Sequence, residues 1–378
     1  TAFWAGPAAT HAMAALGADV VKVESIQRPD LMRYTTVKPP SVDQWWEWGP
    51  VFHGANAGKR SVTLDLNREE GRDLVRRLIA AADVVIENFT PRVLDGFGLD
   101  WDAVHAINPR AVMVRMPAFG LDGPWRDRTG FAQNVEQVSG MAWVTGYADG
   151  PPRIPRGPCD PLGGMHAVFA TMVALDRRDA TGEGVLVEAT LAEVALNVAA
   201  EQVVEHDAYG VLLERRGNDP LPGTRVQGVF ACEGGTDAWV AIACETDAQL
   251  AALRGLAGDD VAAWCASRPP ADAAEALVAA GVPAGDVIRQ ERAAFNEQLV
   301  ARGFFEELDH PVVGRHAFPS LPFAFRTSQP GGRRWLRSPA PTLGQHNDEV
   351  LTGDLGLSAE DLARLRDDKL IGERPLGV

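Results

Sequence analysis

Apolar and polar residues follow one another in the first 200 residues in a pattern that predicts repeated helices and strands. A helical segment over residues 8–16 is followed by an apolar run at 20–24, which is typical of a buried strand. Residues 69–82 carry apolar positions at helical spacing, and strand-like runs follow at 82–87 and 111–116. Alternation of strands and helices favours an α/β fold with a Rossmann-like parallel sheet, whose ligand binds beyond the carboxyl ends of the strands.

The pattern changes after residue 206. Two strand-like runs, 227–232 and 238–244, flank a Gly-containing turn and predict a hairpin, and further helical segments follow. We therefore predict a large α/β domain, a smaller α+β domain and a C-terminal segment that returns to the large domain, over residues 1–206, 207–325 and 326–378. Because the α/β pattern opens without its first strand, we expect that strand upstream of residue 1.

Length, charge and cysteine content restrict the classes of protein to consider. The chain has 378 residues, enough for two domains, and a net charge of −15, which argues against nucleic acid as a partner. No apolar run is long enough to predict a membrane span, and the first residues do not resemble a signal peptide. The four cysteines have neither zinc-site nor disulfide-scaffold spacing, so we expect no metal and a cytoplasmic location.

The segment around Asp160 carries the strongest chemical signal. A carboxylate with an ordinary pKa of about 3.9 is ionised at pH 7 and is an oxygen nucleophile that needs no base beside it. Gly163 and Gly164 follow at the start of a predicted helix, where their N–H groups would face a developing negative charge. This combination suits acyl transfer through an aspartyl intermediate. Asp before Pro is also a common helix N-cap, and the residues of this segment leave both interpretations open.

Eight separated motifs occur in order along the chain. They occupy residues 3–24, 56–66, 82–94, 160–165, 181–184, 280–285, 310–314 and 343–347. Together they resemble the class III CoA-transferase family of CaiB/BaiF type, which includes formyl-CoA, carnitine and bile-acid CoA-transferases. The resemblance implies a CoA-binding large domain, a small domain and two chains interlocked as rings in a homodimer. It also implies that Asp160 is the nucleophile, with Gly163 and Gly164 beside it.

The resemblance further implies contacts with CoA, which would be a substrate and not a permanently bound cofactor. The residues that match these contacts are Phe3, Trp4, Ala5, Arg28, Arg33, Leu64, Asn88 and Phe89, and Arg92 and Arg128 are added as basic residues that could offset the phosphates. The first three would line the pantetheine path, and Leu64 would lie beside adenine. The arginines would bind phosphate, to which a guanidinium donates two parallel hydrogen bonds. Arg92 would replace an arginine that family members often carry at the position of Thr90.

The predicted activity is transfer of CoA from an acyl-CoA donor to a carboxylic acid acceptor. One alternative is a 2-methylacyl-CoA racemase, which needs a second acid or base facing the aspartate. Racemases of this family place a histidine upstream of the aspartate, whereas residues 130–134 here contain Phe131 and no histidine. A second alternative is a non-catalytic CoA-binding subunit that depends on a partner chain.

Overall fold

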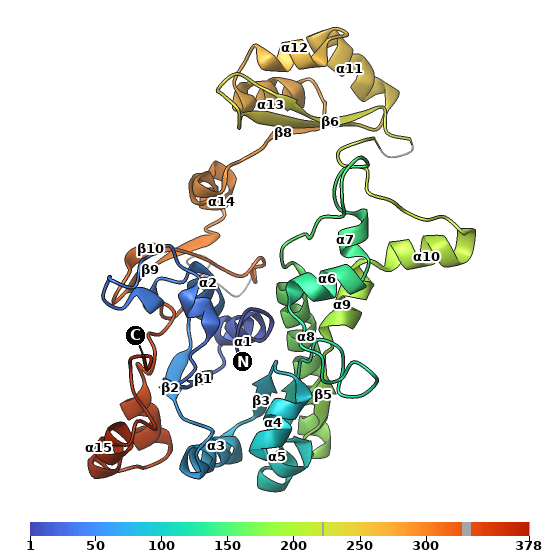
Figure 1. The fold of residues 1–378 in the computed structure, drawn as a ribbon. Coiled ribbons are helices and arrows are strands. Elements are labelled where there is room, and N and C mark those ends of the chain that lie inside the picture. Colours follow the sequence, from blue (N-terminus) through green and yellow to red (C-terminus); the bar gives the residue numbers. More distant parts are fainter. Residues whose placement is uncertain (221–222, 327–333, 378) are drawn as a thin grey trace. The chain divides into compact units, whose positions relative to one another are not determined.

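A computed structural model describes residues 1–220, 223–326 and 334–377 (Figure 1). The chain forms two compact units, and each is described by itself. The first unit comprises residues Thr1–Ala142, Ile154–Leu212 and Val300–Val378, and the second comprises Trp143–Arg153 and Leu213–Leu299. The division at residues 206 and 325 stays a prediction. No helix in the described ranges is both long and apolar enough to cross a bilayer.

The first unit contains two parallel sheets. β1 (Val21–Glu24) pairs with β2 (Arg60–Thr63), and their first residues lie opposite each other. The second sheet has the order β3-β4-β5, formed by β3 (Val84–Glu87), β4 (Val112–Arg115) and β5 (Leu186–Glu188). All four residues of β4, the central strand, are buried, as expected for a parallel strand covered on both faces. The predicted mixed α/β fold with parallel sheets is confirmed.

Helices connect and cover these strands. They are α1 (Ala5–Leu16), α2 (Pro50–Asn56), α3 (Glu69–Ala81), α4 (Pro91–Phe97), α5 (Trp101–Ile107), α6 (Ala132–Val138), α8 (Cys159–Thr181), α9 (Leu191–Val198) and α10 (Ala200–Tyr209). The helical spacing of Leu74, Val75, Leu78 and Ile79 predicted one apolar face of α3; Leu74 and Ile79 are buried, and Val75 and Leu78 are half-buried. The run over residues 191–206, which is rich in Ala and Val, predicts one long helix, but the helix is interrupted at Ala199, which separates α9 from α10.

The helices α1 and α8 lie side by side because both carry small residues where they meet (Figure 1). A Cβ added to Gly164 would lie 2.9 Å from the carbonyl oxygen of Ala5 and 2.9 Å from the amide nitrogen of Ala9. A Cβ added to Gly163 would lie 2.4 Å from the side chain of Leu191. This close approach brings the beginnings of two helices together at one place.

Residues after Val300 complete the first unit. Their elements are β9 (Phe305–His310), β10 (Gly314–Pro319), η4 (Glu349–Asp354) and α15 (Ala359–Asp367), together with the last residues of α14 (Glu297–Ala301). Asn347 accepts a hydrogen bond from the backbone N–H of Thr63 at 2.8 Å, and the hydroxyl of Thr63 donates to the carbonyl of Gly372 at 2.7 Å. The C-terminal residues therefore contact the edge strand β2.

The second unit is a small antiparallel sheet with helices. Its elements are β6 (Val226–Ala231), β7 (Trp239–Cys244), β8 (Ala284–Asp286), α11 (Asp247–Ala257), α12 (Val261–Ala266), α13 (Pro270–Ala279) and η3 (Gln290–Phe295). The predicted hairpin is confirmed, since β6 pairs with β7 in antiparallel register. Cys244, Leu253 and Leu277 are fully buried between the sheet and the helices. α7 (Met141–Val144) spans the boundary between the units.

Candidate active site

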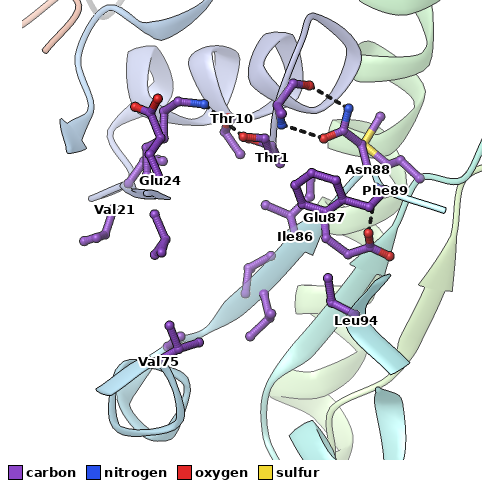
Figure 2. Close-up of a pocket in the computed structure, with 18 of the residues that line it drawn as sticks. Thr1, Thr10, Val21, Glu24, Val75, Ile86, Glu87, Asn88, Phe89 and Leu94 are labelled. Carbon is purple, nitrogen blue, oxygen red and sulfur yellow. Dashed lines mark hydrogen bonds between the residues drawn. The ribbon is translucent and has the colours of Figure 1, made fainter. Parts of the chain in front are cut away.

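A cavity of about 1590 Å³ in the first unit runs along β1 and β3 and reaches Asp160. In Figure 2, Val21 of β1 lies on one wall, Ile86 of β3 and Leu94 lie on the other, and Val75 of α3 lies between them. The cavity is larger than the roughly 300–1,000 Å³ of most small-molecule sites. Part of it is the space between β1 and β3, which are edge strands among the described ones. The strand expected upstream of residue 1 stays a prediction.

Asp160 lies in the first turn of α8 and lines this cavity, although only 8% of its surface is exposed. The N-cap of α8 is Pro158, so the interpretation of Asp160 as the capping residue is wrong. The pKa of Asp160 is raised to about 6, first by burial and then by the negative charge of Glu136, while a contact with Cys159 opposes the rise. The carboxyl is therefore mostly ionised at pH 7, but it is a stronger base than an ordinary aspartate.

A strained turn leads into α8. Arg156 and Gly157 have φ angles of 73° and 105°, in the left-handed region that disfavours side chains. The carboxylate of Glu136 accepts hydrogen bonds from both backbone N–H groups, at 3.2 Å from Arg156 and 2.6 Å from Gly157. A Cβ at Gly157 would also lie 2.8 Å from the ring of Trp4. The turn thus depends on a glycine and on a buried carboxylate that the sequence analysis missed.

Gly163 and Gly164 lie inside α8, not at its start. Because α8 begins at Cys159, the helical N–H groups of these glycines point to the carbonyls of Cys159 and Asp160. Neither glycine is among the residues that line the cavity. The structure therefore gives them a packing role against Leu191 and α1, and it provides no support for the oxyanion contact expected of their N–H groups.

The segment before α1 contributes to the cavity wall. Phe3 lines the cavity with a φ of 61°, and its N–H donates to Asp30 Oδ1 at 3.0 Å. Its ring meets that of Phe131 edge-on, with 4.9 Å between centroids. Ala5, the first residue of α1, also lines the cavity. Trp4 does not line it, and its ring instead packs on Gly157.

Asn88 and Phe89 follow β3 and line the cavity beside the start of the chain (Figure 2). The side-chain amide of Asn88 exchanges two hydrogen bonds of 2.8 Å with the backbone of Ala2, and Glu87 accepts the N–H of Phe89 at 2.8 Å. Asn88 therefore also holds the segment that leads into α1. Leu64 reaches the cavity although its side chain is almost completely covered.

The four candidate arginines lie in different environments. Arg28 and Arg92 are exposed at the cavity, and Arg92 donates to the carbonyl of Asp127 at 3.2 Å. Arg33 is fully buried and forms ion pairs with Glu24 at 2.8 Å and with Glu47. Its guanidinium therefore binds two carboxylates of the protein, and Arg33 does not line the cavity where we expected it to contact a phosphate.

The fourth arginine, Arg128, is exposed and lies 4.6 Å over the ring of Trp125, away from the cavity lining. Cys159, next to the nucleophile candidate, is fully buried, and burial raises the pKa of its thiol to about 12. A thiol in this state is not a nucleophile at neutral pH, which leaves the carboxylate of Asp160 as the candidate nucleophile of this turn.

Comparison with known proteins shows the family to which this chain belongs. The model of CoA-transferase family III matches residues 1–262 and 255–347. The chain is 31% identical over 400 residues to succinyl-CoA–D-citramalate CoA-transferase of Chloroflexus aurantiacus, covering 98% of this chain and 95% of the relative. It is also 31% identical to the succinyl-CoA–L-malate CoA-transferase beta subunit of that organism, covering 97% and 95%.

The fold comparison agrees. A CAIB/BAIF family protein from Brucella suis superposes with a TM-score of 0.81 at 31% identity, covering 94% of this chain and 96% of that one. The chain belongs to the class III CoA-transferases and is a transferase enzyme, as the motifs predicted.

Proposed function

We propose that this enzyme transfers CoA from an acyl-CoA to a carboxylic acid through covalent intermediates on Asp160. The observation that carries the proposal is the position of this carboxylate, which lies on the wall of the large cavity with a pKa raised to about 6. A more basic carboxylate is a better nucleophile, and it is still mostly ionised at pH 7.

The proposed reaction conserves charge and bonds at each step. An oxygen of Asp160 attacks the thioester carbonyl, the C–S bond breaks, and CoA leaves as a thiolate, which gives a mixed anhydride. The thiolate then attacks the carboxyl carbon of Asp160, and the C–O bond of the anhydride breaks. This step releases the donor acid as a carboxylate and leaves an aspartyl-CoA thioester. The acceptor carboxylate repeats these two steps in reverse. Because one thioester replaces another, the exchange needs no ATP, and bound CoA acts as an intramolecular reactant.

The cavity offers contacts for the CoA moiety. The matched residues that line it are Phe3, Ala5, Arg28, Leu64, Asn88, Phe89 and Arg92. We place the pantetheine arm beside Phe3 and Asn88 and the phosphates near Arg28 and Arg92, because exposed guanidinium groups bind phosphate strongly. The positive end of α1 at Ala5 opens onto the same cavity, where it would favour the developing oxyanion.

The relatives suggest which acids to test first. Two of them are named for succinyl-CoA as donor, with D-citramalate and L-malate as acceptors. We therefore propose a dicarboxylic acyl-CoA as donor and a small hydroxy acid as acceptor. We also propose an interlocked homodimer in the cytoplasm. Because one relative is named as a beta subunit, assembly with a different partner chain is the alternative to a homodimer.

The racemase alternative finds no support in the segment where racemases of this family place their histidine. The residues of the 129–131 segment that line it are Thr129, Gly130 and Phe131, and none of these side chains exchanges protons near neutral pH. Glu136 does not line the cavity, and its oxygens are bonded to the backbone.

The test is covalent trapping combined with turnover. Incubation with succinyl-CoA should give an adduct on Asp160 in peptide mass spectrometry, and a panel of small hydroxy acids should reveal the acceptor. Asp160→Asn should still bind CoA but should lose turnover on the order of 10³-fold or more, because the nucleophile is gone. Retained turnover in this variant would overturn the mechanism. Deuterium uptake at Cα of a branched acyl-CoA without any acceptor acid would instead favour the racemase.

A further inference from the structure

Glu136 is a completely buried carboxylate close to Asp160 in the first unit. Its side chain on α6 is completely covered, and no cation forms an ion pair with it in the described parts of the chain. Both oxygens instead accept backbone N–H groups, from Gly157 at 2.6 Å and from Arg156 at 3.2 Å. Burying a carboxylate without a cation is costly, so a group retained in this state has a specific consequence for its surroundings.

The turn that Glu136 holds is the one that carries Asp160. Arg156 adopts a φ of 73°, a conformation that a residue with a side chain keeps only where its surroundings hold it there. Asp160 donates its own N–H to the carbonyl of Gly157 at 3.1 Å, three residues away. The position of the Asp160 carboxylate therefore depends on the bonds that Glu136 makes.

Glu136 is also the charged neighbour that acts on Asp160. Its negative charge is the second cause, after burial, of the raised pKa of Asp160. The thiol of Cys159 interacts with both carboxylates and cannot neutralise either, because burial keeps it protonated with a pKa of about 12. Two like charges thus meet at the start of α8, where water screens them little.

Titratable groups on the other elements around α8 have partners of their own. His11 of α1 is bonded to the carbonyl of Ala57, Arg115 of β4 pairs with Glu87, and Glu188 of β5 accepts the N–H of Leu121. Glu193 of α9 is exposed. Among the described residues, Glu136 is therefore the negatively charged group that acts on Asp160.

We propose that Glu136 is a positioning residue that holds the turn at Arg156–Gly157 and whose charge drives Asp160 toward its uncharged, acylated state. The inference rests on the proposed function of Asp160. When the Asp160 oxygen bonds to the acyl carbon, its negative charge moves to the departing CoA thiolate. The repulsion from Glu136 is relieved in that step, so the covalent intermediate gains stability relative to the free carboxylate.

The kinetic test separates charge from geometry. In the wild type, kcat should fall below pH about 6 as Asp160 is protonated. Glu136→Gln removes the charge and should move this acid limb about one pH unit lower, with less covalent adduct at steady state. Glu136→Asp keeps the negative charge, but its shorter side chain no longer reaches the N–H groups of the turn. The value of kcat should therefore fall about tenfold or more, while the acid limb of the pH profile stays at the same pH. Glu193→Gln, on the exposed face of α9, is the matched control and should change neither quantity.

A second measurement does not require activity. The Asp160 carboxyl carbon can be followed by ¹³C NMR in the free protein and assigned by its loss in Asp160→Asn. Its pKa should lie near 6 in the wild type and lower in Glu136→Gln. An unchanged pKa and an unchanged acid limb in Glu136→Gln would overturn the inference, as would Glu136→Asp with unaltered kcat. If Glu136→Gln does not fold, Glu136→Asp provides the test, because a shift of its acid limb would contradict the proposal. Failure of transfer with a shifted NMR pKa would refute only the proposed function.

Discussion

At the scale of single residues, the site depends on unusual backbone and charge states more than on residue types. Phe3, Arg156 and Gly157 all have positive φ, and all lie within the candidate site or its supporting turn. Such conformations persist only where neighbouring bonds hold them; here Asp30 accepts the N–H of Phe3, and Glu136 accepts the N–H groups of the turn. The conformation that presents Asp160 is therefore determined by side chains far away in sequence.

Gly157→Ala tests this dependence on the turn. The new methyl group would be strained at a φ of 105° and would lie 2.8 Å from the ring of Trp4. We expect a loss of about 1–3 kcal/mol in the free energy of unfolding and at least a tenfold lower kcat, measured by urea denaturation and transferase assay. Gly98→Ala is the control, since Gly98 has a φ of 63° and open space around it. Equal effects of both variants on kcat would contradict the role given to the turn.

At the scale of elements, the approach of α1 to α8 sets the geometry of the cavity wall. The contact is made by small residues, with Gly164 and Ala167 of α8 against Ala5 and Ala9 of α1. Because the nearest atoms to Gly164 belong to the backbone of α1, no rotamer change can make room there. The two helices must separate to accept any larger residue, and both Ala5 and Asp160 would move with them.

We therefore expect Gly164→Ala to destabilise the protein by about 1–3 kcal/mol and to lower the yield of covalent adduct. Thermal unfolding and adduct mass spectrometry measure the two effects. Gly96→Ala in α4 is the matched control, because no atom lies within 4 Å of its added Cβ. Alanine is the better helix former, so this control should be neutral or stabilising by up to about 1 kcal/mol. A neutral Gly164→Ala would show that α1 and α8 are not closely packed in solution.

At the scale of the whole molecule, buried histidines determine how the fold responds to acid. The rings of His53 of α2 and His310 of β9 contact each other edge-to-face, with 4.6 Å between ring centroids. Burial lowers the pKa of His53 to about 4 and that of His310 to about 3, and it lowers the pKa of His11 to about 4. The unfolded chain takes up these protons near pH 6.5, whereas the folded chain does not.

The free energy of unfolding should therefore fall as the pH is lowered from about 6.5 to about 4, by up to ~1.4 kcal/mol per pH unit for each histidine. Asp160 acts in the opposite direction below pH about 6, since its raised pKa makes the folded state bind a proton first. Urea denaturation at a series of pH values measures the slope. His53→Gln should reduce it, and His166→Gln, at an exposed position, should leave it unchanged. A flat profile in the wild type would refute this account.

The periodicity of apolar residues was sufficient to predict most elements of the first 200 residues and the hairpin of the second unit. It did not predict the hairpin β9–β10, whose strand β9 carries Glu306, Glu307 and Asp309. Adjacent charged residues, of which Glu306 is half-buried, obscure the alternation on which a strand prediction rests. The interruption at Ala199 was missed for a different reason, because alanine is compatible with a continuous helix.

The sequence by itself determined the family and the α/β class, because ordered motifs and local periodicity are properties of the chain, and the same motifs led to the proposal of Asp160 as nucleophile. The tertiary structure alone decided the roles of several residues around it. It made Gly163 and Gly164 packing positions, joined Arg33 to Glu24 and Glu47, and brought Glu136 to the turn before Asp160. Such roles follow from burial and from contacts between distant segments, and neither quantity is encoded in the spacing of residues along the chain.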